Sequence, residues 1–160
     1  MSTAASLHWQ VHRFDALSPA ALHDILRLRV DVFIVEQQCI YPEIDGQDPE
    51  ALHVTGRDAD GRLLAYARIL PPHADGLPHI GRVVVHPEAR GRALGREVMW
   101  HALLAVKATY GSLRSALAAQ AHLQVFYESL GYRRIGEEYV WDGIPHVDME
   151  RGDAPLNGTA

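Results

Sequence analysis

The sequence contains a single cysteine, Cys39, and has no excess of basic residues. One cysteine excludes an intrachain disulfide framework and fits a reducing compartment. Lys and Arg together number 15 against 20 Asp and Glu, which gives a formal net charge of −5. A general nucleic-acid binder is normally basic, so this composition argues against that class.

Long apolar segments are also absent. No run approaches the roughly eighteen apolar residues of a membrane-spanning helix, and residues 1–12 lack the basic start and apolar centre of a signal peptide. The ten histidines form neither a Cys/His cluster nor a His-Glu-x-x-His pair. We therefore expect a cytoplasmic protein with no membrane partner, no nucleic-acid partner and no metal site.

The composition is sufficient for one folded domain. Hydrophobic residues make up 48% of the 160 residues, which is enough to build a core. Residues 1–152 contain all of the patterned segments, and we expect them to form a single domain. Residues 153–160 are small and polar, which predicts a disordered tail.

The pattern of residues predicts alternating strands and helices. Ser18 as an N-cap, followed by Pro19, predicts a helix that runs to about residue 37 and leads into a loop over 39–50. Asp60-Gly61 predicts a hairpin, and Asp142-Gly143 predicts another near the end of the chain. The remaining expected elements are strands at 7–14, 79–86 and 113–120, a long helix at 91–110 and a short helix at 122–131. This order predicts an α+β fold with a mixed sheet and helices on its faces, and it excludes a doubly wound dinucleotide fold.

The stretch EARGRALG, residues 88–95, joins the strand at 79–86 to the long helix. Unpaired N–H groups and the macrodipole at a helix start favour a bound phosphate, and glycines allow the backbone to come close to it. The spacing does not match a mononucleotide P-loop, because Gly95 lies too near Gly91 and no Lys-Ser/Thr pair follows. A dinucleotide turn is excluded as well, since its second glycine is missing.

Residues 83–95, VVVHPEARGRALG, resemble the pyrophosphate-binding motif of the GNAT acyltransferases, Arg/Gln-x-x-Gly-x-Gly/Ala. Arg90 and Gly95 match this motif, whereas Ala93 stands where the central glycine usually lies. Residues 120–132, QAHLQVFYESLGY, are similar to a later segment of the family, with Gln120 and Tyr127 at its Asn and Tyr positions. Together with residues 28–48 and 142–149, these stretches resemble the ElaA-like branch of the superfamily over about residues 7–150.

The resemblance implies a central mixed, mostly antiparallel sheet with helices on both faces and a splayed pair of central parallel strands. It also implies an N-acetyltransferase, which transfers an acetyl or other acyl group from acetyl-CoA to a primary amine by direct attack in a ternary complex. The pantetheine arm would bond to the main chain of Val83 and Val85. The cofactor-binding residues that it implies are Val83, Val84, Val85, Arg90, Gly91, Arg92, Ala93, Leu94, Gly95, Arg96 and Gln120.

Charge supports the same cofactor independently. A CoA thioester carries about four negative charges, so an acidic protein needs a local positive patch to hold it. We expect the patch to consist of Arg82, Arg90, Arg92 and Arg96. The loop at 36–50 has five carboxylates and no basic residue, which favours a cationic acceptor such as an amine.

The implied reaction needs an acid and a base. By resemblance Tyr127 is the general acid, a phenol that donates a proton to the departing sulfur. An ammonium must lose a proton before it can attack, and the candidate bases are Glu36, Asp45, His53 and His146. Two alternatives remain at this point: an acyl-homoserine-lactone-synthase-like acyltransferase, and a non-catalytic module that binds CoA or a protein partner. The sequence also leaves open a homodimer and the identity of the amine.

Overall fold

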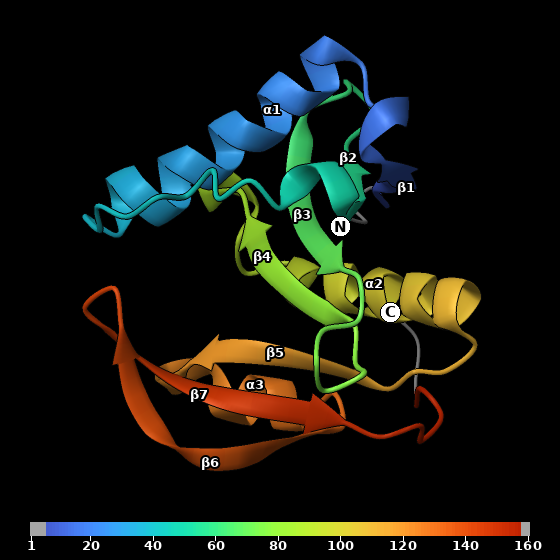
Figure 1. Ribbon diagram of the computed structural model, residues 1–160. Helices are drawn as coiled ribbons and strands as arrows, with labels where there is room; N and C mark the ends of the chain where they lie inside the picture. The colour runs from blue at the N-terminus through green and yellow to red at the C-terminus, as the bar shows by residue number, and fades with distance from the viewer. Residues whose placement is uncertain (1–5, 158–160) are drawn as a thin grey trace.

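The protein is described here by a computed structural model in which residues 6–157 are placed. It contains a seven-stranded sheet in the order β1-β2-β3-β4-β5-β7-β6 (Figure 1). All neighbouring strands are antiparallel except the central pair β4 and β5. The strands are β1 (His8–Arg13), β2 (Leu52–Arg57), β3 (Leu63–Leu70), β4 (His79–Val85), β5 (Ser115–Gln120), β6 (Tyr132–Trp141) and β7 (Ile144–Arg151). The predicted α+β class and mostly antiparallel sheet are confirmed.

Helices cover both faces of this sheet. On one face α1 (Pro19–Val30) buries Ile25 and Leu28 against Tyr66 of β3 and Val84 of β4. The opposite face packs against α2 (Leu94–Tyr110) and α3 (Gln124–Glu128), which contribute to the larger of the two cores (Figure 1). Among the described residues no helix combines the length and apolarity that a bilayer crossing requires.

The start of α1 follows the predicted capping pattern. The Ser18 hydroxyl accepts the N–H of Ala21 at 3.0 Å, and Pro19 occupies the first turn, where its missing N–H costs nothing. Beyond Val30 the chain stays helical but widens into a π-helix at Asp31–Glu36. The predicted end near residue 37 is therefore confirmed, although the last turns are wound more loosely than expected.

The long helix α2 buries one face and ends at a glycine. Its inward residues Val98, Ala102 and Val106 are fully buried, as their helical spacing predicts. Gly111 follows the helix with φ of 78°, a left-handed conformation that glycine adopts without a steric penalty. The helix begins at Leu94 and not at Gly91 as expected, because the preceding three residues form the turn described below.

The central strands part almost as soon as they meet. β4 and β5 form one parallel pair, His79 with Ala116, and then diverge toward their C-terminal ends (Figure 1). β5 pairs along its whole length with β7 instead. The sheet therefore consists of two halves that open into a V, as the resemblance implies.

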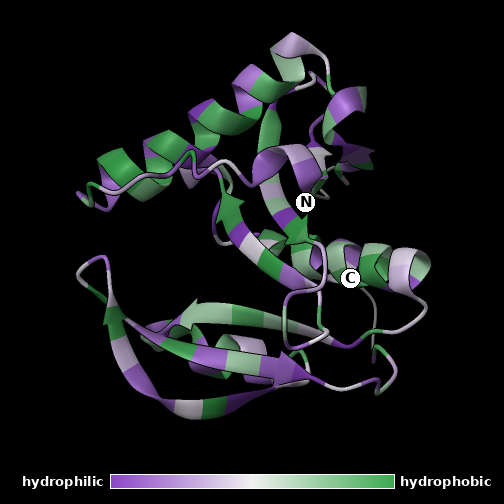
Figure 2. Ribbon diagram, in the orientation of Figure 1, coloured by the Kyte–Doolittle hydropathy of each residue, from purple (hydrophilic) through white to green (hydrophobic). Residues whose placement is uncertain are grey.

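The C-terminal half of the sheet has one face that no helix within residues 6–157 covers (Figure 1). Hydrophilic and hydrophobic bands alternate along β7 (Figure 2). Val147 and Met149 point into the core, so the alternate residues His146 and Asp148 lie on the open face.

The chain after β7 remains in contact with the domain. Asp153 accepts the N–H of Leu113 at 2.7 Å, and Leu156 packs against the core. Two contacts thus connect residues 153–157 to the domain, and the disordered tail that the composition of residues 153–160 predicts stays a prediction. The rest of that predicted tail, 158–160, lies outside the described residues.

Candidate active site

The turn between β4 and α2 presents backbone N–H groups at a helix start. Gly91 and Ala93 adopt left-handed conformations, with φ of 80° and 57°. The helical hydrogen bonding of α2 starts with the bond that the Glu97 N–H donates to the Ala93 carbonyl, at 3.2 Å. The N–H groups of Leu94, Gly95 and Arg96 precede it, and they lie at the positive end of the helix dipole. These donors suit an anion such as a pyrophosphate.

Ala93 explains how the turn departs from the family motif. A left-handed conformation is unfavourable for a residue with a Cβ atom, and the family usually places glycine here. Ala93 nevertheless adopts the conformation that a glycine would take. The shape of the turn is therefore retained at some local strain.

The arginines around this turn differ in their partners. Arg90 makes a bidentate ion pair with Glu36, in which its two terminal nitrogens lie 2.6 and 3.0 Å from the two carboxylate oxygens. This pair connects the end of the π-helical segment to the turn. Arg96 donates to the Ser129 hydroxyl at 3.2 Å. Among residues 6–157, Arg92 and Arg96 have no ion-pair partner, so they are the turn's free positive charges.

Arg82 does not belong to this patch, contrary to the expectation from sequence. Its guanidinium donates to the Glu43 carboxylate and to the Glu43 carbonyl, both at 2.9 Å, and it approaches Asp45 at 3.4 Å. The side chain therefore points to the loop after α1 and not toward the phosphate-binding turn. Sequence position alone could not distinguish these directions, because β4 is irregular at this residue.

The carboxylates of that loop are paired inside the protein. Arg29 of α1 is fully buried and contacts Glu43 at 2.6 Å and Asp48 at 2.7 Å. Arg68 of β3 contacts Asp45 at 2.7 Å and Asp48 at 3.1 Å. With Arg82 as the third partner, three arginines balance three loop carboxylates. The loop at 36–50 is therefore not the free acidic surface that its composition suggests.

The pKa values of the loop reflect this pairing. Burial alone would raise the pKa of Asp45, but hydrogen bonds from Arg68 and from the Gln47 N–H outweigh it and hold this pKa well below its ordinary value. Burial would likewise raise the pKa of Asp48, and the hydrogen bonds and charges of Arg29 and Arg68 reverse the direction. Both carboxylates thus remain ionised, with their charges already compensated.

This buried network was missed at the sequence level, although one signal pointed to it. Arg29 continues the apolar spacing of α1, so its side chain faces inward rather than to solvent. A buried guanidinium needs a carboxylate partner. The loop that follows the helix is the nearest acidic segment in the chain and supplies that partner.

Tyr127 lies on α3, beside the start of α2. The next-door residue Phe126 comes within 3.6 Å of the position that a Cβ on Gly95 would occupy, so α3 and the turn are in contact. Tyr127 is 6% exposed, and its ring packs edge-on against Phe126 and Tyr132. Burial raises the pKa of Tyr127 to about 12. Its hydroxyl has no hydrogen-bond partner among residues 6–157 and is free to donate to a ligand.

Gln120 and the three valines border the opening of the sheet. Val83, Val84 and Val85 end β4, and Gln120 ends β5 across the gap. The amide of Gln120 donates to the Gln37 side chain at 3.3 Å. This contact joins the end of the first helical segment to the other half of the sheet.

The four candidate bases occupy different environments. Glu36 is held by Arg90, whose hydrogen bond lowers the pKa of this carboxyl, and Asp45 is held by Arg68. His53 is fully buried and bonded on both ring nitrogens, to the Tyr66 hydroxyl and the Asp48 carbonyl, and burial lowers its pKa. Among the four, only His146 has a ring nitrogen on the open face that is left without a partner by the part of the chain that the structure describes.

The geometry of His146 determines which nitrogen is free. Its Nδ1 lies 2.7 Å from the Ile144 carbonyl, which can only accept, so Nδ1 carries the proton of the neutral ring. Nε2 then bears a lone pair and has no hydrogen-bond partner among the described residues. His146 pairs with Gln120 in the β5–β7 ladder, which places it beside the opening.

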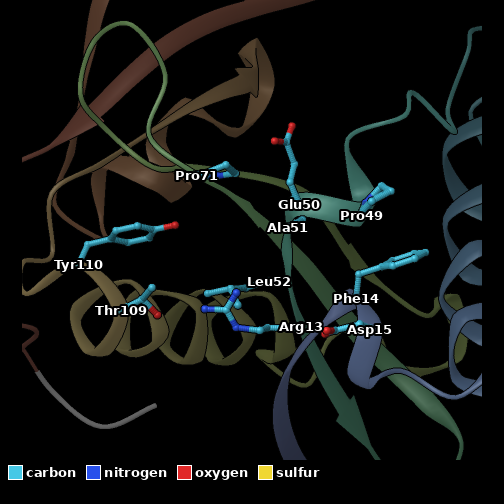
Figure 3. A pocket seen from close by; sticks show the side chains of 10 residues that line it. All are labelled: Arg13, Phe14, Asp15, Pro49, Glu50, Ala51, Leu52, Pro71, Thr109 and Tyr110. Carbon is cyan, nitrogen blue, oxygen red and sulfur yellow. The ribbon is translucent and has the colours of Figure 1, made fainter.

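The cavity between β1, the start of β2 and the end of α2 does not contribute to this site. A cavity of about 320 Å³ is lined by Arg13, Glu50 and Tyr110 among others (Figure 3). Its lining includes Thr109, which lies fifteen residues after Leu94 in α2. Because a helix rises about 1.5 Å per residue, the cavity lies about 22 Å from the turn.

No group of three or more His, Cys, Asp or Glu side chains within 6–157 is arranged to hold a metal ion.

Comparison with known proteins identifies the family. Residues 21–152 match the family model described as an acetyltransferase (GNAT) domain. Protein ElaA of Escherichia coli is 41% identical over 148 residues, which cover 91% of this chain and 96% of ElaA. The ElaA crystal structure has a TM-score of 0.83 and covers 91% of this chain and 99% of its own.

Two further solved structures are similar. An acyl-CoA N-acyltransferase from Pseudomonas aeruginosa is 41% identical with a TM-score of 0.87, covering 92% of this chain and 100% of its own. An aminoglycoside 6′-N-acetyltransferase complexed with coenzyme A shares the fold at 18% identity and a TM-score of 0.68, covering 93% of this chain and 99% of its own. On the family match and these identities, this chain belongs to the GNAT acetyltransferase family.

Proposed function

We propose that the protein is an acetyl-CoA-dependent N-acetyltransferase that acetylates a primary amine by direct attack in a ternary complex. The observation that carries this proposal is the meeting of three features at the split in the sheet. The helix-start N–H groups offer an anion site, Tyr127 offers beside it a phenol with no hydrogen-bond partner among residues 6–157, and His146 of β7 offers, opposite Gln120 of β5, a ring nitrogen that is likewise unbonded within those residues.

The turn from Arg90 to Arg96 would bind the pyrophosphate of acetyl-CoA. Its N–H groups supply directed hydrogen bonds, and Arg92 and Arg96 supply positive charge in an otherwise acidic protein. The main chain of Val83 and Val85 would hold the pantetheine arm in the gap. When bound, acetyl-CoA supplies the thioester whose carbonyl carbon the amine attacks.

His146 would serve as the general base. Its Nε2 takes a proton from the acceptor ammonium, which frees the nitrogen lone pair for attack on the thioester carbonyl. The carbon–nitrogen bond forms, the carbon–sulfur bond breaks, and Tyr127 donates its proton to the departing sulfur. Glu36, Asp45 and His53 are less suited because each is already held by partners within the protein.

The open face beside His146 carries a suitable charge for an amine. Asp148 is exposed and has no cation within ion-pair distance among residues 6–157, while the Tyr139 hydroxyl donates to it at 2.6 Å. In the ladder Asp148 lies opposite Ala118 of β5, so only a small side chain separates it from the gap. An ammonium group would be attracted to this carboxylate, and the aromatic side chains Tyr139 and Trp141 would border it.

The experiment is a panel of primary amines assayed with acetyl-CoA, with CoA thiol release and the mass of the N-acetylated product as readouts. We expect at least one amine to be acetylated, His146→Gln to lower kcat, and Asp148→Asn to raise the amine KM with little effect on the acetyl-CoA KM. As a matched control, Glu137→Gln changes an exposed carboxylate of β6 and should leave both constants unchanged. Binding of CoA without acetylation of any amine would instead support a non-catalytic module.

A further inference from the structure

β4 contains a bulge at Arg82. The β3–β4 ladder pairs Tyr66 with Val84 and Arg68 with Gly81, so two residues of β4 lie opposite one residue of β3. This count defines a β-bulge, which bends the strand and leaves the extra residue outside the regular ladder. Arg82 adopts a φ of 51°, in the left-handed region.

The backbone of Arg82 is unfavourable for any residue with a Cβ atom. Glycine is the residue that normally occupies such a position, and β4 has a glycine immediately before it, at position 81. Arginine in the left-handed conformation therefore needs contacts elsewhere that hold it there.

The side chain of Arg82 makes these contacts with the acidic loop. It donates twice to Glu43, at 2.9 Å to the carboxylate and 2.9 Å to the carbonyl, and its guanidinium lies over the Tyr41 ring at 5.5 Å from the centroid. Glu43 is itself 4% exposed and fixed by the buried Arg29. The bulge is thus tied to a buried, doubly ion-paired carboxylate of the loop and not to an exposed surface group.

The bulge lies where the sheet opens. The single pair between β4 and β5 is at His79, three residues before Arg82, and no pairing between these strands continues beyond it. Val83, which follows Arg82 and shares the irregular segment, is one of the two residues whose main chain would bond to pantetheine. A change in the backbone at residue 82 would reorient the peptide groups of its neighbour.

We propose that Arg82 is a positioning residue for the acyl donor, which holds the bulge of β4 through the acidic loop so that the main chain of Val83 and Val85 faces the pantetheine arm. The loop therefore acts on the donor side of the reaction, through the backbone and not through its charge. This inference rests on the proposed function for its kinetic consequence, while the clamp itself is a property of the free protein.

The test compares Arg82→Ala with Arg82→Gly. Both variants remove the guanidinium, but only glycine adopts the left-handed conformation without strain. We expect Arg82→Ala to lower kcat/KM for the acyl donor by roughly ten- to a hundredfold, on the order known for a displacement of about 1 Å at a reacting group. Arg82→Gly should recover most of this loss. Arg27→Ala, which removes an exposed arginine of α1, is the matched control and should behave as wild type.

A second donor separates positioning from direct charge contact. S-acetylpantetheine lacks the nucleotide and its phosphates, so a backbone effect of Arg82→Ala should reduce its kcat/KM by the same factor as that of acetyl-CoA. A loss with acetyl-CoA only would mean that Arg82 contacts phosphate, and an Arg82→Gly variant as impaired as Arg82→Ala would mean that the side chain acts by its charge. Either result overturns the proposal.

Hydrogen–deuterium exchange tests the clamp without any turnover. In the free protein we expect faster exchange over residues 79–86 in Arg82→Ala than in wild type, and a smaller change in Arg82→Gly. Unchanged exchange in Arg82→Ala would overturn the clamp even if wild type is active. If wild type acetylates no amine, the proposed function fails, and the exchange comparison still decides whether Arg82 holds the bulge.

Discussion

Replacement of Tyr127 by phenylalanine separates catalysis from packing. The variant keeps the ring that packs edge-on against Phe126 and Tyr132, with centroids 5.0 and 6.1 Å away, and loses only the hydroxyl. That hydroxyl has no hydrogen-bond partner among residues 6–157, so its removal leaves no protein group unpaired. Because this oxygen is not fully buried, its removal should change the free energy of unfolding by less than about 1 kcal/mol.

The kinetic effect of Tyr127→Phe should be larger than this change in stability. General acid catalysis is typically worth about 10²- to 10⁴-fold, and a thiolate with a pKa of about 8.5 is able to leave without full protonation. Since burial raises the pKa of Tyr127 to about 12, the phenol is a weak acid toward sulfur, and the lower end of that range applies. We expect kcat to fall about 100-fold, which is about 2.7 kcal/mol in activation free energy, while the acetyl-CoA KM changes little.

The pH dependence gives an independent check on Tyr127. An acid must be protonated to act, so its contribution is present below its pKa and is lost as the pH rises through about 12. The rate profile of wild type should therefore show no descending limb from Tyr127 below about pH 11. The measurements are steady-state kinetics across pH and thermal denaturation of both proteins. A variant with full kcat, or one that melts well below wild type, would show that Tyr127 is a packing residue.

Three further substitutions test the turn and the buried network. Gly95→Asp should weaken acetyl-CoA binding in calorimetry by more than about tenfold, because it places negative charge beside the phosphates. Gly95→Ala is its control, since the added Cβ meets its nearest atom at 3.6 Å; equal losses in both would mean that bulk and not charge is responsible. Ala93→Gly should raise the free energy of unfolding by up to about 1 kcal/mol in thermal denaturation, because it relieves a left-handed alanine, and a decrease would contradict the assigned strain. Asp48→Asn should lower the free energy of unfolding in urea by about 3–5 kcal/mol, because Arg29 and Arg68 lose a buried partner. Because folding lowers the pKa of Asp48, wild type should lose the stability that this carboxylate contributes as the pH falls below about 4. An Asp48→Asn variant that unfolds at the same acidic pH as wild type would refute the stabilising role of Asp48.

Local signals in the sequence determined most of the secondary structure and the anion-binding turn. The Ser18-Pro19 start, the hairpin at Asp60-Gly61 and the glycine-rich turn before α2 depend on the conformational preferences of adjacent residues. Such preferences act within a few residues, so they can be recognised without knowledge of the fold. The resemblance to the family added the split in the sheet, which no local pattern indicates.

The tertiary structure alone decided which charges meet and which side chains remain free. Arg82 pairs with Glu43, 39 positions away, although its place in the sequence suggests that it belongs with the arginines of the turn. The bulge at residue 82 sets the direction of that side chain, and the bulge arises from the register between two strands. The open nitrogen of His146 likewise depends on the absence of a helix over one face of the C-terminal half-sheet within the described residues. Ion pairing and burial are set by distances through space, and those distances exist only once the strands, the loop and the helices have packed together.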